Sequence, residues 1–251
     1  MVNSIRTTPL FLFFDLVQQT LRGVFRRPFR QADFFKQLYF IANESLVIVL
    51  FCVSFAAMVT ILESSFHMRL VIQNDSMVPG FAAMLILKEL GAVVTALLLT
   101  SRVGAGFAAE IGSMQITEQI DALRILGIDP VRYLVVPRFL ACVCAGVILT
   151  ILANIVCLYC SMLVSEVYLG FSFGMFQTSM RRFVEFKDLI DATIKGACFG
   201  AVIPLVSSFF GFRCQSGAEG VGNATTHSVV TSSVAIIIID FVLSYIFTYS
   251  S

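Results

Sequence analysis

Five long runs of apolar residues divide this chain of 251 residues. They cover residues 45–62, 78–101, 139–165, 189–212 and 229–247. A helix needs about 20 mainly apolar residues to cross the hydrocarbon core of a bilayer, where its backbone polar groups must be paired within the segment. The runs are continuously apolar, whereas the strands of a membrane barrel alternate. The pattern therefore predicts an all-α integral membrane protein with five transmembrane helices in one domain, residues 1–251.

A shorter amphipathic segment, residues 8–30, precedes the first run. Its polar side chains recur at helical spacing from Asp15 through Gln18 and Gln19 to Arg22, while leucine and phenylalanine fill the other face. Such a helix lies in the membrane interface with its apolar side in the lipid. We expect either a simple membrane anchor or an elbow helix that packs against the spans.

Another short helix is expected between the second and third runs, at residues 116–126. Its apolar residues recur at i, i+4 and i+7: Ile116, Ile120 and Leu123. Thr117 is placed to cap the N-terminus, and Gly127 supplies a C-terminal stop. Taken alone, this pattern fits an ordinary surface helix equally well.

Composition and charge place the chain in a membrane and orient it there. Apolar residues make up 58% and charged residues 13%, and the mean hydropathy is +0.90, so there is too little polar surface for a soluble domain. The net charge of +1 gives no overall surface for nucleic acid. Eleven basic residues flank the spans on the side of the N-terminus and four on the other side. The positive-inside rule therefore predicts a cytoplasmic N-terminus and a C-terminus outside.

Charged residues inside the spans are candidates for function, because a charge in the hydrocarbon region is costly. Lys88 lies ten residues into the second run, and Glu89 points about 100° away from it on a helix. We expect one or both to line a polar cavity or a dimer axis, either as buried ion pairs with other spans or as contacts for a phospholipid headgroup. Asp191 and Lys195, four residues apart, are predicted to form a local ion pair. Asp240 is expected to pair with a serine or threonine of a neighbouring span.

The chain contains no motif for energy conversion or catalysis that its context supports. None of its four lysines stands in G-K-[ST], so there is no phosphate-binding loop for ATP. Residues 170–174 match G-x-S-x-G and residues 104–109 match the dinucleotide fingerprint, but neither follows a predicted strand. The seven cysteines lie in or beside apolar runs, which predicts neither a disulfide framework nor a metal site. We therefore expect no enzyme and no cofactor in this chain.

Five short motifs follow one another between the middle of the second run and the start of the fifth. They are KELG at 88–91, RVGAG at 102–106, AEIGSM at 109–114, TEQIDAL at 117–123 and GAEGVGNATT at 217–226. In this order and placement they resemble the MlaE (YrbE) family of permeases. The resemblance implies an interfacial elbow helix, five spans and a short cytoplasmic coupling helix. It also implies a membrane subunit of an ATP-binding-cassette (ABC) transporter that moves phospholipids between the inner and outer membranes and so maintains lipid asymmetry.

The resemblance also implies partners and site residues. Two permease copies would pair with two cytoplasmic ATPases that bind ATP and magnesium, together with an external MCE-type lipid-binding protein and often a STAS-domain protein, at the inner membrane. The candidate residues for lipid contact are Lys88, Glu89 and Glu63. The candidates for contact with the ATPase, or for support of that surface, are Glu110, Thr117, Glu118, Gln119, Asp121 and Leu123.

Two positions depart from the family pattern. Many relatives have a proline where this chain has Ala92, so a kink in the second span is in question. Relatives often have glutamine at the position of Glu63, where an extra acid would alter headgroup preference.

Two other functions stay open. A proton-driven secondary transporter, with Lys88, Glu89 and Asp240 as relay groups, is one alternative. A non-transporting scaffold for the MCE protein and the ATPase is the other.

Overall fold

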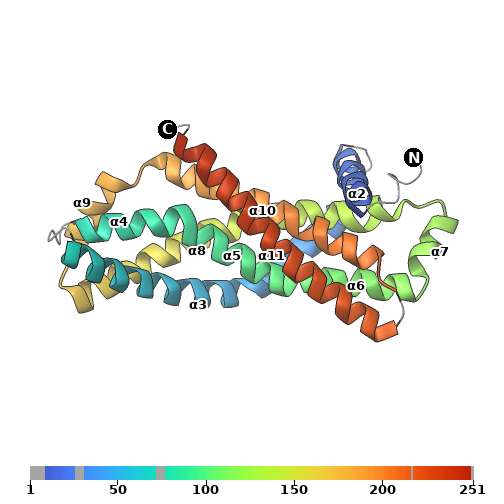
Figure 1. Ribbon diagram of the computed structural model, residues 1–251, viewed down its shortest axis with the longest axis horizontal. Coiled ribbons are helices and arrows are strands. Elements are labelled where there is room, and N and C mark those ends of the chain that lie inside the picture. The colour runs from blue at the N-terminus through green and yellow to red at the C-terminus, as the bar shows by residue number, and fades with distance from the viewer. Residues whose placement is uncertain (1–8, 26–30, 72–76, 216, 250–251) are drawn as a thin grey trace.

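The computed structural model describes residues 9–25, 31–71, 77–215 and 217–249. Within them, five helical segments are long and apolar enough to cross a membrane, which confirms the predicted all-α membrane fold. They run along an elongated bundle, with α11 crossing the others obliquely (Figure 1). The segments are Gln31–Met68, Val78–Ile116, Val131–Leu169, Phe186–Phe212 and Gly217–Tyr249.

Each transmembrane helix continues beyond the apolar run that predicted it. The run at 45–62 lies inside a helix of 41 residues, because no glycine or proline interrupts the polar residues on either side of it. The full order is α2 (Pro9–Val24), α3 (Gln31–Val71), α4 (Val78–Leu85), η2 (Ile86–Leu90), α5 (Gly91–Leu99), η3 (Thr100–Gly104), α6 (Ala105–Ile116), α7 (Gln119–Ile125), η4 (Val131–Val135), α8 (Val136–Leu169), α9 (Phe173–Phe183), α10 (Phe186–Phe212) and α11 (Gly217–Tyr249).

The amphipathic helix α2 lies across the bundle at the end that also carries α7, and α9 lies at the opposite end (Figure 1). Helix α2 packs on η4, α8 and α10, and its residues Leu16 and Thr20 are buried. Its other face exposes Leu10 and Phe14. Of the two interpretations of this segment, the packed elbow helix is therefore correct. Residues 8 and 26–30 of the predicted segment lie outside the described residues.

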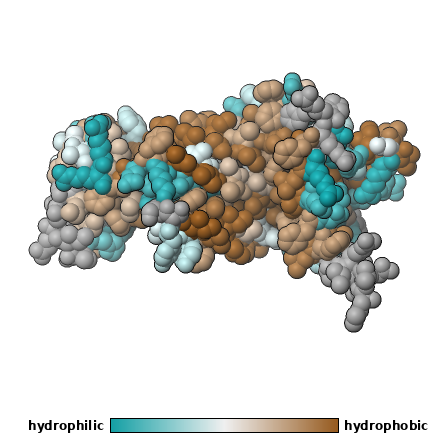
Figure 2. Space-filling model, turned by 90° about the horizontal axis from the view of Figure 1, so that it is seen from above, coloured by the Kyte–Doolittle hydropathy of each residue, from teal (hydrophilic) through white to brown (hydrophobic). Residues whose placement is uncertain are grey.

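The outer surface of the bundle carries the apolar belt expected of a membrane protein. On the face shown in Figure 2, hydrophobic residues cover the middle of the long axis, and hydrophilic residues gather nearer the two ends. The helices α3 and α11 contribute long exposed stripes to this surface. Those stripes include Val47, Phe51, Phe55 and Val59 on α3, and Val234, Ile238, Phe241 and Tyr245 on α11.

The second span is one continuous rod that contains two π-helical segments. It runs through α4, η2, α5, η3 and α6 without a proline at position 92. In η2 the backbone N–H of Gly91 bonds to the carbonyl of Ile86, five residues back. Asn154 of α8 packs directly against Gly91, where a Cβ atom would overlap its side chain. The close approach of α8 thus requires glycine immediately after η2.

We expect Gly91→Ala to lower the stability of the protein by about 1–3 kcal/mol, because the added methyl group overpacks the α5–α8 contact. The measurement is thermal unfolding in detergent, followed by fluorescence-detected size exclusion. Gly106→Ala is the matched control on the same rod, since a Cβ atom there meets nothing within 4 Å. Equal melting temperatures for the two variants would show that the contact with Asn154 does not constrain the rod.

Candidate functional site

Charged side chains from three helices meet inside the membrane-crossing part of the bundle. Glu89 of η2, Lys195 of α10, and Asp240 and Ser244 of α11 form what we call the charge cluster. Lys195 is its centre and is 2% exposed. Buried charges are retained only where they are paired, so the cluster fixes how η2, α10 and α11 pack.

The ammonium group of Lys195 has four oxygen partners. Its Nζ donates to Glu89 Oε1 at 3.0 Å, to Ser244 Oγ at 2.7 Å and to the backbone carbonyl of Lys88 at 2.9 Å. It also forms an ion pair with Asp240 Oδ1 at 2.8 Å. Ser244 in turn donates to Glu89 Oε1 at 3.0 Å. One buried cation thus holds two carboxylates, and its removal would leave excess negative charge inside the bundle.

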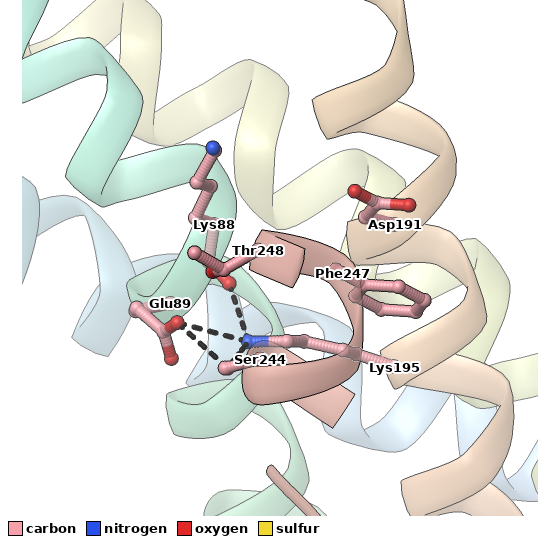
Figure 3. A pocket seen from close by; sticks show the side chains of 7 residues that line it. All are labelled: Lys88, Glu89, Asp191, Lys195, Ser244, Phe247 and Thr248. Atoms are coloured by element: carbon pink, nitrogen blue, oxygen red, sulfur yellow. Dashed lines mark hydrogen bonds and ion pairs between the residues drawn. The ribbon is translucent and has the colours of Figure 1, made fainter. Parts of the chain in front are cut away.

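Lys88 belongs to a separate ion pair on the other side of η2. Its Nζ lies 3.1 Å from Asp188 Oδ1, and Asp188 also accepts from the backbone N–H of Glu185 in the capping box that starts α10. In Figure 3 the side chain of Lys88 points away from Lys195. The side chains of Lys88 and Glu89 remain 46% and 45% exposed, which leaves both within reach of a ligand outside the bundle.

The two predictions for the deep charges of α10 and α11 were wrong in their partners. Lys195 binds Glu89 and Asp240 instead of Asp191, which lies apart from its ammonium group in Figure 3. Asp240 accordingly pairs with a lysine and not with a serine or threonine. Side chains four residues apart on a helix can pair, but here opposite charges on neighbouring helices lie closer to the ammonium group.

Sequence reasoning missed Lys195 and Ser244 as members of the cluster, although a signal was available. Lys195 lies nine residues after the start of α10, Asp240 nine residues before the end of α11 and Glu89 eleven residues after the start of α4. At 1.5 Å per residue these positions are all about 15 Å from the same end of the bundle. Equal depth would have placed the three charges in one layer.

A small cavity of about 40 Å3 adjoins the cluster. It has room for little more than water, because one water molecule occupies about 30 Å3 in the liquid. Because Lys195 itself is 2% exposed, a phospholipid headgroup can meet only the exposed parts of this site, Lys88 and Glu89. The lining residues, drawn in Figure 3, are Lys88, Glu89, Asp191, Lys195, Ser244, Phe247 and Thr248.

Glu63, the third candidate for lipid contact, does not belong to the charge cluster. Its side chain is 66% exposed on α3, and its carboxylate lies 3.6 Å from the imidazole of His67 one turn later. The structure therefore places Glu89 in the charge cluster, Lys88 in the adjacent ion pair with Asp188, and Glu63 at a separate surface position.

The short helix α7 differs at its start from the sequence prediction. It spans Gln119–Ile125 instead of residues 116–126, and Glu118 at its N-cap adopts a left-handed φ of 58°. Thr117 ends α6, where its hydroxyl donates to the carbonyl of Ser113 at 2.8 Å, so it does not cap α7. The chain must turn sharply between two helices here, and that turn occupies both residues. The predicted stop at Gly127 is confirmed, with φ of 73°.

The residues of α7 divide into a buried side and an exposed tip. Ile120 is fully buried, and Leu123 packs partly buried against the same core. Ile125 and Leu126 are 87% and 73% exposed, an apolar pair that sequence reasoning did not single out. Among the other candidates, Thr117, Glu118, Gln119 and Asp121 are exposed, and Glu110 binds Arg138 of α8 at 2.7 Å.

The motifs that sequence analysis set aside have structural roles in helices. Ser172 of the G-x-S-x-G match is the N-cap of α9, and its Oγ accepts from the backbone N–H of Met175 at 3.4 Å. Residues 104–109 lie within η3 and α6. All seven cysteines are free thiols.

A bundle of membrane-crossing helices with paired charges buried between its spans defines a multi-pass membrane protein of the transporter type. The chain belongs to the MlaE permease family, whose model, described as Permease MlaE, matches residues 34–246. It is 34% identical over 245 residues to a probable ABC transporter permease protein of Rickettsia conorii, which covers 98% of this chain and 92% of that protein.

Two further relatives widen the comparison. The intermembrane phospholipid transport system permease protein MlaE of Haemophilus influenzae is 32% identical over 212 residues, 84% of this chain and 81% of that protein. The chloroplastic protein TRIGALACTOSYLDIACYLGLYCEROL 1 of Arabidopsis thaliana is 41% identical over 168 residues, 67% of this chain but only 48% of that protein. The chain thus matches about half the length of the plant relative.

Proposed function

We propose that this chain is the permease subunit of an ABC transporter that moves phospholipids between the inner and outer membranes. Membership of the MlaE family and the printed function of the Haemophilus relative support this proposal. The observation that carries it in this chain is the half-exposed pair Lys88 and Glu89 beside the buried charge of Lys195. A charged site at this depth fits the handling of a charged headgroup within the membrane.

In this proposal, Lys88 binds the phosphate of a phospholipid as a point charge, and Glu89 binds the amine of an ethanolamine headgroup. Glu63 supplies a further headgroup contact at the outer end of α3. Two copies of the chain enclose the lipid between them, and an external MCE-type protein exchanges lipid with that cavity. The N-terminus and α7 are cytoplasmic in this arrangement, and the C-terminus is periplasmic.

The helix α7 is the proposed coupling helix, which a separate ATPase contacts. Glu118, Gln119 and Asp121 are exposed and suited to polar contact, and the tip formed by Ile125 and Leu126 offers an apolar anchor. The remaining candidates act by support: Leu123 through the core, Glu110 through its ion pair with Arg138, and Thr117 through the turn. ATP and magnesium bind to the ATPase, which a STAS-domain protein joins.

Reconstitution in nanodiscs with and without the ATPase tests this function. We expect ATP hydrolysis and lipid transfer only in the complex, and Lys88→Gln is expected to lower lipid transfer about tenfold through loss of a charge-assisted contact. Arg182→Gln, which removes an exposed charge on α9, is the control and should transfer lipid normally. ATP hydrolysis by the isolated chain would contradict the proposal.

The same assay separates the alternatives. The ion pairs of Lys195 with Glu89 and Asp240 are the observation that favours a proton-driven transporter, since chains of titratable groups in membranes relay protons. Transport that follows the membrane potential and ignores ATP would select that function. A scaffold would bind the MCE protein and the ATPase equally well with and without the charge of Lys88.

A further inference from the structure

A second cavity with charged side chains in its lining lies at the end of the bundle that carries α2 and α7. Its volume is about 240 Å3, and it lies between the beginning of α3, the end of α6 and the beginning of α8. Four charged side chains line it: Asp33, Lys36, Glu110 and Arg138. Glu110 lies 21 residues after Glu89 on the same rod, about 30 Å along its axis. This cavity is therefore distinct from the charge cluster.

Arg138 is the most buried of the four groups, with 3% exposed. Its Nη2 donates to Glu110 Oε1 at 2.7 Å, and the guanidinium lies 5.2 Å from the centroid of the Phe107 ring. Its Nε and Nη1 have no acceptor among the described residues. Burial of unpaired donors is costly, and a guanidinium carries five N–H donors of which Glu110 satisfies a minority. Arg138 thus has capacity for a further anionic acceptor.

The packing of α2 indicates where this cavity lies relative to the membrane surface. Val136, two residues before Arg138, lies against Gly23 of α2, where a Cβ atom would come within 2.7 Å of the valine side chain. An amphipathic helix with exposed apolar residues, such as Leu10 and Phe14, lies at the boundary between headgroups and acyl chains. Arg138 therefore lies at the level of the phospholipid headgroups on the α2 side of the membrane.

The size and charge of the cavity identify the ligand by its chemistry. A volume of about 240 Å3 exceeds that of a single water, about 30 Å3 in the liquid, severalfold. The planar fork of an arginine matches two oxygens of a phosphate, and Lys36 adds a second positive charge. Asp33 and Glu110 supply carboxylates that suit an amine. This balanced lining fits a zwitterionic phosphate diester better than a doubly charged inorganic phosphate.

We propose that this cavity binds the phosphate of a zwitterionic phospholipid headgroup from the leaflet beside α2. Arg138 is the main phosphate ligand, Lys36 the second cation, and the carboxylates of Asp33 and Glu110 face the amine. The inference rests on the proposed function for the class of lipid, but it assigns a second site for that lipid. A free phosphate would use the same donors, and the experiment separates the two sources.

The experiment is native mass spectrometry of the full chain, released from nanodiscs of phosphatidylethanolamine and phosphatidylglycerol. In a Lys88→Gln background, which removes the phosphate contact of the first site, retention of phosphatidylethanolamine is expected to fall about tenfold in Lys36→Gln, which loses one charged contact, and to disappear in Arg138→Gln. Arg182→Gln removes an exposed charge at the opposite end of the bundle and should retain the lipid. Inorganic phosphate is expected to leave the lipid bound. Displacement of the lipid by inorganic phosphate would show that the cavity binds free phosphate and would overturn the proposal of a lipid headgroup.

Unchanged lipid retention in both Lys36→Gln and Arg138→Gln would overturn the proposal. Because Arg138 is buried and its variant is at risk of misfolding, the result for the exposed Lys36 decides on its own. If these variants lose ATPase binding but keep an unchanged lipid count, the cavity is a contact site for the partner protein, and the proposal is overturned as well. Absence of lipid transfer by the wild-type complex, in contrast, would reject the proposed function whatever the cavity binds.

Discussion

Replacement of Lys195 by methionine is expected to abolish lipid transfer and to destabilise the bundle by about 3 kcal/mol. Removing one partner of a buried ion pair costs about 3–5 kcal/mol, because the other charge stays buried without compensation. The lower end applies here, since the side chain of Asp240 is 18% exposed and that of Glu89 is 45% exposed, so water reaches part of the site. Thermal unfolding and lipid transfer in nanodiscs measure the two effects.

A double variant separates folding from function in this test. Lys195→Met with Asp240→Asn removes the cation together with the more buried carboxylate, so we expect it to recover most of the lost stability. Transfer is expected to stay absent, because Glu89 no longer has the ammonium group that holds it. If Lys195→Met melts and transfers lipid like the wild type, the cluster has neither a structural nor a functional role.

Leu126→Asp is expected to weaken association with the ATPase by about thirtyfold or more. Leu126 is 73% exposed at the tip of α7, and apolar anchors at the centre of an interface contribute about 2 kcal/mol or more. The fold should be unaffected, since substitution at an exposed position usually changes stability by less than about 0.5 kcal/mol. Affinity for the purified ATPase and the rate of ATP hydrolysis by the complex measure the effect.

Arg124→Gln is the matched control on the same helix. Asp121 pairs with Arg124 at 2.8 Å, and both side chains are more than half exposed, so this ion pair contributes little. We expect ATPase binding close to that of the wild type. Normal ATPase binding by Leu126→Asp would show that the tip of α7 is not the coupling surface.

The five spans, the interfacial helix and the loop helix follow from patterns that a short stretch of sequence contains. The lengths of the helices do not, because hydropathy marks only the part of a helix that lies in hydrocarbon. The 41-residue α3 extends well past its apolar run for this reason. Helix caps show the same limit. Threonine is a residue type that suits an N-cap, but the turn between α6 and α7 makes Thr117 the C-cap of α6.

The site was predictable in its charged residues but not in their pairing. Lys88 and Glu89 stand out in an apolar run, and both do line a polar cavity. The partner of Lys195 depends on the rotation of η2, α10 and α11 about their axes, which sequence periodicity in an almost uniformly apolar helix does not fix. The unpaired donors of Arg138 depend in the same way on packing against Phe107.

The rod from Val78 to Ile116 contains two π-helical turns, η2 and η3, at which a change of helix register would cost least. Its 39 residues span about 58 Å, from the α9 end of the bundle to the base of α7. A π-helical turn holds one surplus residue, and moving that surplus along the rod by one position turns the intervening side chains by about 100°. Such a slip at η2 would exchange Lys88 for Glu89 in front of Lys195. A push at one membrane surface would thereby invert the charge presented to a headgroup deep in the bilayer.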